Sequence, residues 1–382
     1  MASSTQNHQQ HHFPNTTTSA PPPTPSTTHP NPATSSAATD LLSRLLNRLP
    51  PTLSATPLRR KSSLTPTTIS PPIIPYTDLN STISTTLHSI SELGYFQLTD
   101  HPIPPHLAHT AQKESLSIFK LSRQEKKHHF SKNWPIGFTN NNEDEDHEDE
   151  DDDSTESLFL DSDSLSDSSD EFSLSSLHGF MHAMEKVGLS VVEGLTCAMG
   201  LVKDGTDGVC SLLWLGDNEG GDQMLGSGSG KFYPYVVGLH YMFSSGRCGL
   251  LSDSGLVSVK TEVDSILVTV GDIAQVWSNG KLKKVRGKPT ISMEEGHTSS
   301  SLSMSLLVTL PLESTVSPLL PRAVVISNHD DTDDNDNQNQ DDQNESIEES
   351  MFSSFSFEDY AWRVYHERVH LKDPLDRYRI QA

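Results

Sequence analysis

The residues best suited to hold a metal ion are two pairs of histidines. His178 and His182, and His366 and His370, are each four residues apart in segments of helical pattern, so each pair would share one face of a helix. Imidazoles at this spacing can bind zinc. A third ligand is not evident for either pair, and the chain contains 18 histidines. We therefore interpret both pairs as ordinary surface or core residues.

Other signatures of catalysis or cofactor binding are weaker still. The glycine-rich stretch 226–230 has neither the lysine of a P-loop nor the spacing of a dinucleotide-binding turn. The three cysteines, Cys197, Cys210 and Cys248, form no C-x-x-C pair, which indicates ordinary thiols in a reducing compartment. We expect the glycine-rich stretch to be a flexible loop.

The acidic residues are concentrated in two segments. The formal net charge is −24, from 51 Asp and Glu against 27 Lys and Arg. Residues 143–171 hold 16 of the acids and residues 330–349 hold 10, and neither segment contains Lys or Arg. The remaining 25 acids face 27 bases, so the rest of the chain is nearly neutral. We expect charge repulsion to keep both segments extended and disordered.

The N-terminal residues 1–70 are rich in Ser, Thr, Pro, Asn and His and contain one acid, Asp40. Such a segment cannot bury enough apolar surface to offset its ordering entropy, so it is predicted to be a disordered tail. Residues 40–49 place leucines at helical spacing, which favours a transient helix over a docking helix for a partner. The tail lacks the apolar core of a secretory signal. The cytoplasm or nucleus is the expected location, with plastid import as the alternative.

Composition also excludes two classes of protein. No apolar run approaches the ~20 residues that span a bilayer. No basic tract is interleaved with aromatic residues, as nucleic-acid binding would require. We expect no membrane span and no nucleic-acid partner.

Apolar periodicity divides the chain into six regions. After the tail, residues 71–140 alternate strands with helices, one of them from about residue 106 to 127, and residues 141–175 form the first acidic insert. Residues 176–322 begin with a long helix, 177–201, and continue as short β segments. The second acidic insert covers residues 323–351. Residues 352–382 end the chain with a helix from residue 357 to about 369.

Several of these pieces, in this order, resemble the plant family of iron(II)- and 2-oxoglutarate-dependent dioxygenases. Residues 94–102 are similar to that family's G-F-F-Q-x-x-N-H-G element, and residues 122–127 to the L-x-x-E-K stretch that follows it. Residues 265–281 match its strand, G-D turn and S-N-G turn, and residues 373–380 match its C-terminal tail. The resemblance implies a mainly β core, a distorted double-stranded β-helix (jelly roll), with flanking α-helices.

The resemblance also implies a chemistry. Members of the family hydroxylate or desaturate a substrate while 2-oxoglutarate is oxidised to succinate and carbon dioxide. An H-x-D motif and a distal histidine hold the iron, which leaves positions open for 2-oxoglutarate and oxygen. The arginine of a later R-x-S motif pairs with the far carboxylate of 2-oxoglutarate.

Two of these positions hold residues that cannot play the family's role. Gly287 stands where the distal histidine is expected, and glycine offers no side-chain donor. Ser301 stands at the arginine position, and a hydroxyl cannot supply the paired donors of a guanidinium. Tyr233 lies in a Tyr-Pro pair similar to the family's Y-P, and the resemblance assigns it a contact with 2-oxoglutarate.

The H-x-D motif has three candidate registers. Counting back from Gly271 without gaps places it at residues 231–233, which read Lys-Phe-Tyr. Pattern matching around Asp253 keeps the aspartate and loses the histidine, and matching around His240 keeps the histidine and loses the aspartate. The hairpin that the family places after the motif would make Asp253 a turn residue. No register restores two ligands of the triad, so His240 and Asp253 are at most remnants of a metal site.

The sequence therefore predicts a dioxygenase-like protein that is catalytically inactive and acts as a binding or scaffold protein. It predicts no catalytic residue, no bound cofactor, and a partner that is another protein or a small apolar ligand. The alternative is an active oxygenase on a plant hormone or specialised metabolite, which would require iron(II) and 2-oxoglutarate. A third hypothesis is a structural interaction protein whose acidic segments bind basic partners.

Overall fold

The computed structural model describes residues 68–130, 134–140, 156–166, 174–201, 208–216, 232–253, 255–292, 302–319, 350–366 and 373–380. All of them belong to one unit, residues 65–382. Most of the predicted tail, most of both acidic inserts, the glycine-rich stretch and Ser301 lie outside the described residues. None of the described helices is both long and apolar enough to cross a membrane.

Eight described strands form one large sheet, in the order β2-β3-β10-β7-β12-β6-β5-β4. Their bounds are β2 Ile73–Pro75, β3 Tyr95–Thr99, β4 Gly137–Asn140, β5 Glu156–Leu160, β6 Cys210–Gly216, β7 Val237–Met242, β10 Ser265–Val270 and β12 Ser303–Thr309. All neighbours pair antiparallel except β2 and β3, which run parallel. Most strands are buried on both faces, which fits their nearly continuous apolar sequences.

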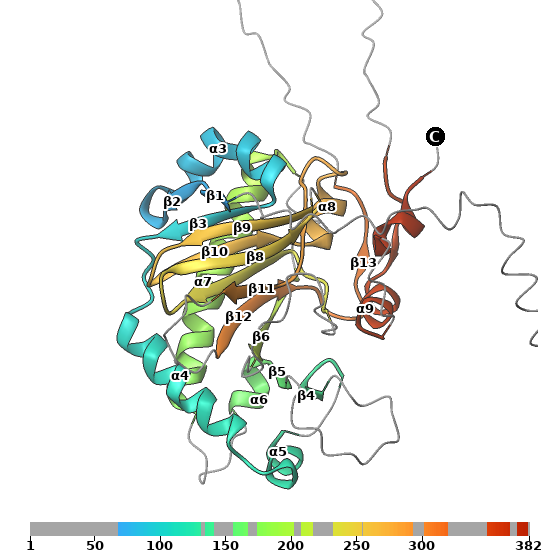
Figure 1. Ribbon diagram of the computed structural model, residues 1–382. Coiled ribbons are helices and arrows are strands. Elements are labelled where there is room, and N and C mark those ends of the chain that lie inside the picture. Colours follow the sequence, from blue (N-terminus) through green and yellow to red (C-terminus); the bar gives the residue numbers. More distant parts are fainter. Residues whose placement is uncertain are drawn as a thin grey trace, which may run out of the picture. The chain divides into compact units, whose positions relative to one another are not determined.

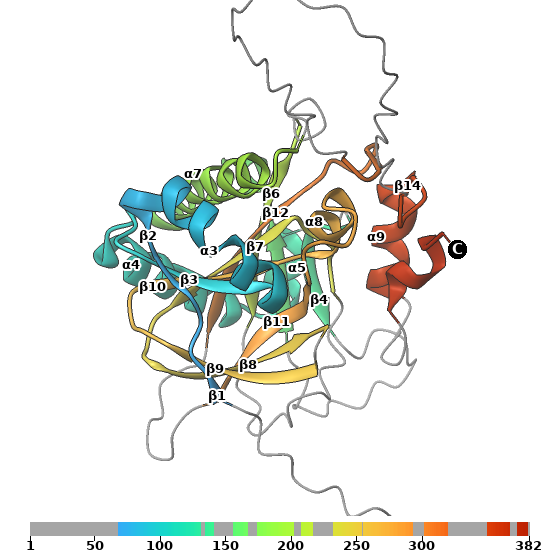
Figure 2. The same ribbon diagram turned by 90° about the horizontal axis from the view of Figure 1, so that it is seen from above.

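Four further strands form a second sheet, in the order β1-β9-β8-β11. Their bounds are β1 Thr68–Ile69, β8 Gly246–Ser252, β9 Gly255–Thr261 and β11 Val285–Ser292. This sheet lies on one side of the large sheet and the helix α7 on the other (Figure 2). These two sheets face each other as in a jelly roll, as the resemblance implied, and do not form a closed barrel.

Helices cover the outer face of the large sheet and one end of both sheets (Figure 1). Their bounds are η1 Tyr76–Asp78, α3 Leu79–Leu93, α4 Pro105–Phe119, α5 Arg123–His129, α6 Ser162–Ser166, α7 Ser175–Ala198, α8 Asp272–Trp277, α9 Phe357–His366 and η3 Pro374–Tyr378. The long predicted helix is α7. It packs closely on β7 and β12, because Gly188 carries no side chain to collide with Leu239 and Val308.

Two predictions about local structure are wrong. The helix predicted from about residue 106 to 127 is two helices, because Ser122 and Glu125 form a capping box that begins α5. Residues 156–166, predicted to belong to the first acidic insert, form β5 and α6. The apolar run 158–160 explains β5: all three side chains are buried against the sheet, and that burial outweighs the surrounding charge.

A buried ion pair fastens the C-terminal segment to the sheets. The short strands β13, Thr315–Val316, and β14, Phe355–Ser356, pair just before α9. The ammonium of Lys284 is fully buried and lies 2.5 Å from a carboxylate oxygen of Asp272 and 2.6 Å from one of Asp373. Arg286 adds a 3.1 Å ion pair with Asp373. Burial opposes ionisation of Asp373, but Lys284 and Arg286 lower the pKa of this carboxyl below its usual value.

Replacing Lys284 with methionine should destabilise the protein strongly, because the carboxylates of Asp272 and Asp373 would lose the buried cation that they share. We expect Lys284→Met to lower the free energy of unfolding by about 3–5 kcal/mol, measured by urea denaturation. The neighbouring Lys283→Met is the control, because Lys283 pairs with Glu92 at the exposed surface and should change stability little. Equal losses in the two variants would contradict the role assigned to Lys284.

Candidate functional site

Residues 232 and 287 meet at one end of the space between the two sheets, where the family resemblance places the metal. Gly287 lies on β11 with φ at +71°. A β-carbon added to Gly287 would overlap the ring of Phe232. Counting back from Gly271 had placed the H-x-D motif at residues 231–233. In the structure Phe232, the middle residue of that stretch, lies against Gly287, where the distal histidine was expected. The three registers of the H-x-D motif remain predictions.

This contact leaves no room for a side chain at the distal position. The Phe232 ring occupies the space that a side chain on residue 287 would need. The left-handed backbone at Gly287 is also one that residues with a β-carbon adopt only at a cost. The sequence analysis placed a glycine at the distal position, but it predicted neither the backbone angle of Gly287 nor the Phe232 ring that packs on it.

Tyr233 lies in a cluster of aromatic rings at the same end. It is 3% exposed, and its ring centroid is 6.3 Å from Phe159, 6.1 Å from Trp134 and 6.0 Å from Phe357. Burial raises the pKa of its phenol above the usual value, so the phenol stays protonated at neutral pH. The predicted contact of Tyr233 with 2-oxoglutarate remains a prediction.

His240 lies deeper between the sheets, within a network of hydroxyl groups. Its Nδ1 is 2.8 Å from Ser305 Oγ, and its Nε2 is 3.0 Å from Thr269 Oγ1. Tyr235 completes the network by bonding Thr269 and donating to the carbonyl of Val285 on the opposite sheet. Burial, reinforced by the positive charge of Lys288, lowers the pKa of His240 to about 3. The imidazole is therefore neutral and fully used in linking strands.

Asp253 lies in the turn between β8 and β9, as the hairpin predicted. Its carboxylate accepts hydrogen bonds from Gln275 Nε2 at 2.7 Å and from the backbone N–H of Lys284 at 3.2 Å. Arg286 adds an ion pair at 3.8 Å. These bonds tie the turn to α8 and β11, so Asp253 and His240 belong to separate clusters.

Sequence reasoning missed two residues at this end of the sheets, Lys288 and Trp214. The Lys288 ammonium lies 5.6 Å from the centroid of the Trp214 ring. Gly216 leaves the space for it, because a β-carbon there would overlap the ammonium. Trp214 is 4% exposed, and its indole N–H finds no acceptor among the described residues. Strand alternation could have placed Trp214 inside, but only the β11 conformation brings Lys288 over it.

The histidine pairs take up different positions. His178 and His182 lie on α7, where His182 pairs with Glu185 at 3.5 Å. His366 ends α9, and its Nδ1 bonds the carbonyl of Trp362. The sequence interpretation overlooked Glu367, which makes residues 366–370 read H-E-R-V-H, a zinc-helix pattern. Residues 367–370 lie outside the described ranges, and the described residues contain no group of three metal-binding side chains.

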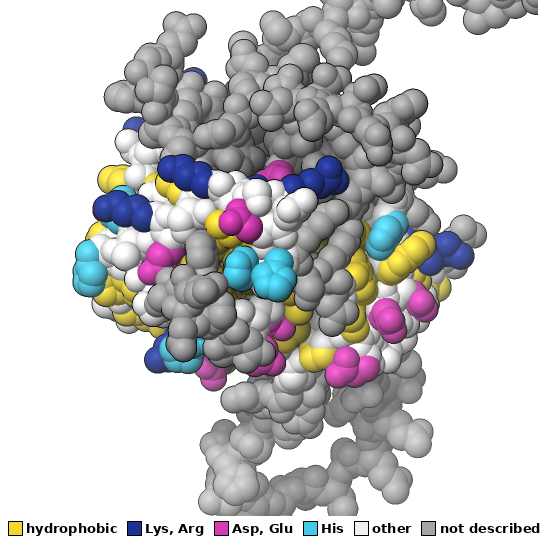
Figure 3. Space-filling model, turned by 90° about the horizontal axis from the view of Figure 1, so that it is seen from below, with side chains coloured by type: hydrophobic (Ala, Val, Ile, Leu, Met, Phe, Trp, Pro, Cys, Tyr) yellow, Lys and Arg dark blue, Asp and Glu magenta, His cyan; other side chains and the backbone are white. Residues whose placement is uncertain are grey.

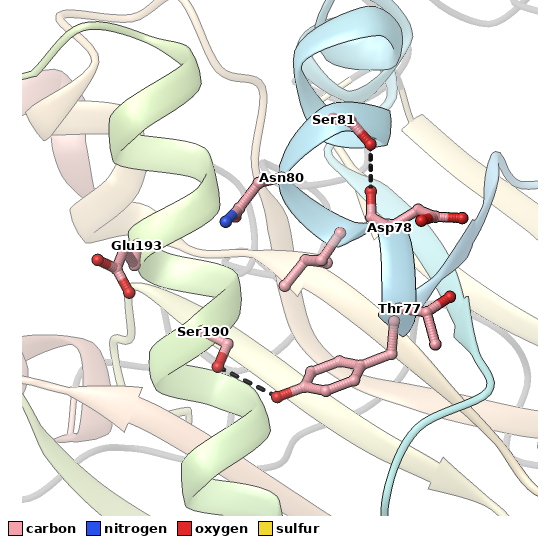
Figure 4. Close-up of a pocket in the computed structure, with 8 residues that line it drawn as sticks. Thr77, Asp78, Asn80, Ser81, Ser190 and Glu193 are labelled. Carbon is pink, nitrogen blue, oxygen red and sulfur yellow. Dashed lines mark hydrogen bonds between the residues drawn. The ribbon is translucent and has the colours of Figure 1, made fainter.

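Two surface features lie away from the sheet interior. A pocket of about 410 Å³ separates the start of α3 from α7, and Tyr76 bonds Ser190 across it at 3.2 Å (Figure 4). On α9, Trp362 is 54% exposed and stacks on His366. Seen from below, hydrophobic, histidine, basic and acidic side chains are all visible on the described part of the surface (Figure 3). Neither feature places convergent, buried polar groups around a ligand-sized space.

Substituting Gly287 tests the packing at the distal position. We expect Gly287→Ala to lower the free energy of unfolding by about 1–3 kcal/mol more than Gly255→Ala. Gly255 is the matched control because its φ is +106° with nothing within 4 Å of an added β-carbon, so it reports backbone strain alone. Adding Phe232→Ala should reduce the difference. Equal losses in the two single variants, measured by urea denaturation, would contradict the overlap.

Acid should weaken the fold through His240. The pKa of His240 is about 3 in the folded protein and about 6.5 when unfolded. The unfolded state therefore binds the extra proton first, and stability falls as pH drops below 6.5. Between pH 7 and pH 5 we expect wild type to lose about 2 kcal/mol that His240→Gln does not lose. The stability contributed by ionised Asp373 is lost only at lower pH, where carboxyl groups of the unfolded chain take up protons, because its pKa is lowered in the folded protein. Parallel losses in urea denaturation of both proteins would contradict this assignment.

Comparison with known proteins gives a consistent result. Residues 72–189 match the family model described as "non-haem dioxygenase in morphine synthesis N-terminal". A search of curated protein sequences finds no match.

Solved structures with this fold include plant dioxygenases. The dioxygenase for auxin oxidation from rice matches with a TM-score of 0.57 at 16% identity, covering 81% of this chain and 100% of that one. JOX2 in complex with 2OG, Fe and JA matches with a TM-score of 0.61 at 15% identity, covering 83% and 91%. The auxin-oxidation dioxygenase 1 of Arabidopsis thaliana matches with a TM-score of 0.51 at 16% identity, covering 65% and 95%. The predicted resemblance is confirmed for residues 72–189, which match the family model, and for the fold, which is that of 2-oxoglutarate- and iron(II)-dependent dioxygenases.

Proposed function

We propose that this protein is a non-catalytic member of the superfamily that acts by binding. The packing of Phe232 on Gly287 carries the proposal. At this position the family's chemistry requires an imidazole nitrogen, whereas this chain has a glycine in a left-handed conformation beneath an aromatic ring. A histidine at residue 287 would have to displace the Phe232 ring and adopt a left-handed backbone conformation, so both oppose the ligand there.

The aspartate position supports the same conclusion. In the register at residues 231–233, Tyr233 stands at the position of the carboxylate ligand. A buried phenol with a raised pKa is a poor substitute for a carboxylate, because it must lose a proton at high cost before it can bind the metal as an anion. Gly287, Phe232 and Tyr233 together do not fit an iron(II) ion that needs two imidazoles and one carboxylate.

The retained part of the molecule is suited to binding. Phe159, Trp134, Tyr233 and Phe357 form an aromatic cluster where the family's reaction would take place. Aromatic rings provide large, rigid apolar surface, and here Phe159, Tyr233 and Phe357 are almost completely buried, so a ligand would have to displace neighbouring side chains to reach them. A small apolar ligand at this end, or a protein partner that docks over it, is the expected occupant. Binding of basic partners by the acidic segments is a separate hypothesis, since those segments are not needed for the cluster.

The competing candidate is an active oxygenase whose ligands come from other residues. It is favoured by two solved structures of similar fold, a dioxygenase for auxin oxidation and JOX2 in complex with 2OG, Fe and JA. At 15–16% identity these likenesses extend to the fold alone. In this view the protein would oxidise a hormone or specialised metabolite.

Turnover of 2-oxoglutarate separates the two candidates. The full-length protein, incubated in air with iron(II), ascorbate and 2-oxoglutarate, should form no succinate above a protein-free control. An active dioxygenase of similar fold, assayed in parallel, shows that the assay detects turnover. Anaerobic calorimetry with iron(II) removes the dependence on an unknown substrate. Succinate above background, or one-to-one iron binding at micromolar affinity, would overturn the proposal.

A further inference from the structure

Trp362 is the only exposed aromatic residue among those that the structure describes. It lies on α9, which stands to one side of both sheets (Figure 1), and it is 54% exposed. Leaving a large apolar ring in contact with water is unfavourable. Tryptophan is also the residue most enriched among those that dominate the energy of protein–protein contacts. Trp362 therefore marks α9 as a candidate docking surface.

The Trp362 ring is held in place without a partner. It stacks on His366 with ring centroids 4.4 Å apart and 25° between the ring planes. His366 is fixed in turn, because its Nδ1 lies 2.8 Å from the carbonyl oxygen of Trp362 and its ring centroid lies 6.3 Å from that of Trp134. Trp134 in turn contacts Tyr233 in the aromatic cluster. A partner that binds Trp362 therefore has little side-chain freedom to remove, which favours affinity.

The same face of α9 carries negative charge. Glu358 and Asp359 precede Trp362 by four and three residues, a spacing that makes them its neighbours on the helix surface. Both are exposed, and neither carboxylate has a partner among the described residues. Arg363 is turned away from them, because its guanidinium donates to the Tyr378 hydroxyl at 2.8 Å. Acids suit the first turn of any helix, but two free carboxylates beside an exposed indole also form an arrangement that attracts a cation.

We propose that this face of α9 docks a basic segment of another protein. The face consists of Glu358, Asp359, Trp362 and His366. A lysine or arginine of the partner lies on the side of the Trp362 ring opposite His366 and pairs with a carboxylate, because cations are attracted most strongly to the face of tryptophan. The net charge of −24 attracts positively charged partners from a distance. The inference deepens the proposed function by naming the docking surface and the chemistry of the partner, and it rests on that function.

A short arginine peptide tests this surface in the full-length protein. The probe is acetyl-Leu-Arg-Arg-Leu-amide, and its uncharged counterpart has citrulline, which is similar in shape, at both arginine positions. Acrylamide quenching of tryptophan fluorescence reports mainly on Trp362, because Trp214 and Trp277 are 4% and 3% exposed and Trp134 is partly buried.

We expect the arginine peptide to shield Trp362 from acrylamide at about 150 mM salt, where long-range attraction to the acidic segments is screened. Equal shielding by the citrulline peptide would overturn the proposal, and so would the absence of binding at millimolar peptide. Binding that is seen by calorimetry but leaves Trp362 unshielded would place the peptide on another surface and would also overturn it.

Variants identify the residues that bind. Trp362→Ala should weaken binding of the arginine peptide about fivefold or more, because the cation loses its ring. Leu189→Ala is the matched control, since Leu189 is an apolar side chain on α7 that is 42% exposed, and it should bind as wild type does. Glu358→Gln combined with Asp359→Asn should weaken binding severalfold, whereas Glu262→Gln, at an exposed acid after β9, should not. All these sites are exposed, so the variants should fold. Unchanged affinity in Trp362→Ala would reject the surface.

Sedimentation separates this surface from a contact between two copies of the chain. Wild type and Trp362→Ala should sediment alike. A wild-type dimer that Trp362→Ala dissociates would assign the face to self-association and would overturn the proposal.

Failure of this inference differs from failure of the proposed function. Absence of peptide binding together with absence of succinate would overturn the docking surface and leave the non-catalytic function standing. Succinate formation would overturn the non-catalytic function, whatever the peptide does. The peptide assay contains no iron and no 2-oxoglutarate, so its readout is independent of turnover.

Discussion

The buried ammonium of Lys284 is the interaction on which the rest of the described structure depends. It joins Asp272 at the start of α8 to Asp373 before η3, and the backbone N–H of Lys284 donates to Asp253 in the β8–β9 turn. A single residue thus holds a helix, a hairpin and the C-terminal segment together. A pair of this kind is costly to bury and costlier to break, so its value lies in fixing one arrangement of these elements.

Strand β11 is irregular directly after these ion pairs. The side chains of Lys284 and Arg286 both form ion pairs with the carboxylate of Asp373. The register between β11 and β8 then shifts between Arg286 and Thr290, and Gly287 takes its left-handed conformation within that shift. The same irregularity places Phe232 over Gly287 and Lys288 over Trp214. Gly287, at the position where a histidine was expected, and Lys288, over Trp214, therefore lie in the same irregular part of β11.

The sequence predicted the fold well wherever apolar periodicity or a local motif was sufficient. The α7 helix, the β8–β9 hairpin and the turn at Asp253 follow from patterns within a few residues. The break between α4 and α5 was missed because a capping box was present but not weighed against the continuous helical pattern. Strand β5 was missed because its three apolar residues lie among acids, and only pairing with β6 shows that they are buried.

At the candidate site, Gly287 could be found by alignment to a motif. The contacts of Phe232, Lys288 and Trp214 depend on strands distant in sequence, so no local pattern reveals them.

The pairing of β4 with β5 has a consequence for how the chain accommodates its first acidic segment. Asn140 pairs with Glu156, so the intervening residues connect two neighbouring strands at the sheet edge, and both ends are fixed. The entropy of closing such a connection grows only with the logarithm of its length, by about 0.6 kcal/mol for each doubling. Length and charge can therefore accumulate between these two strands at almost no cost to the sheets. This makes the β4–β5 connection a place where the protein can gain or lose sequence while the fold stays the same.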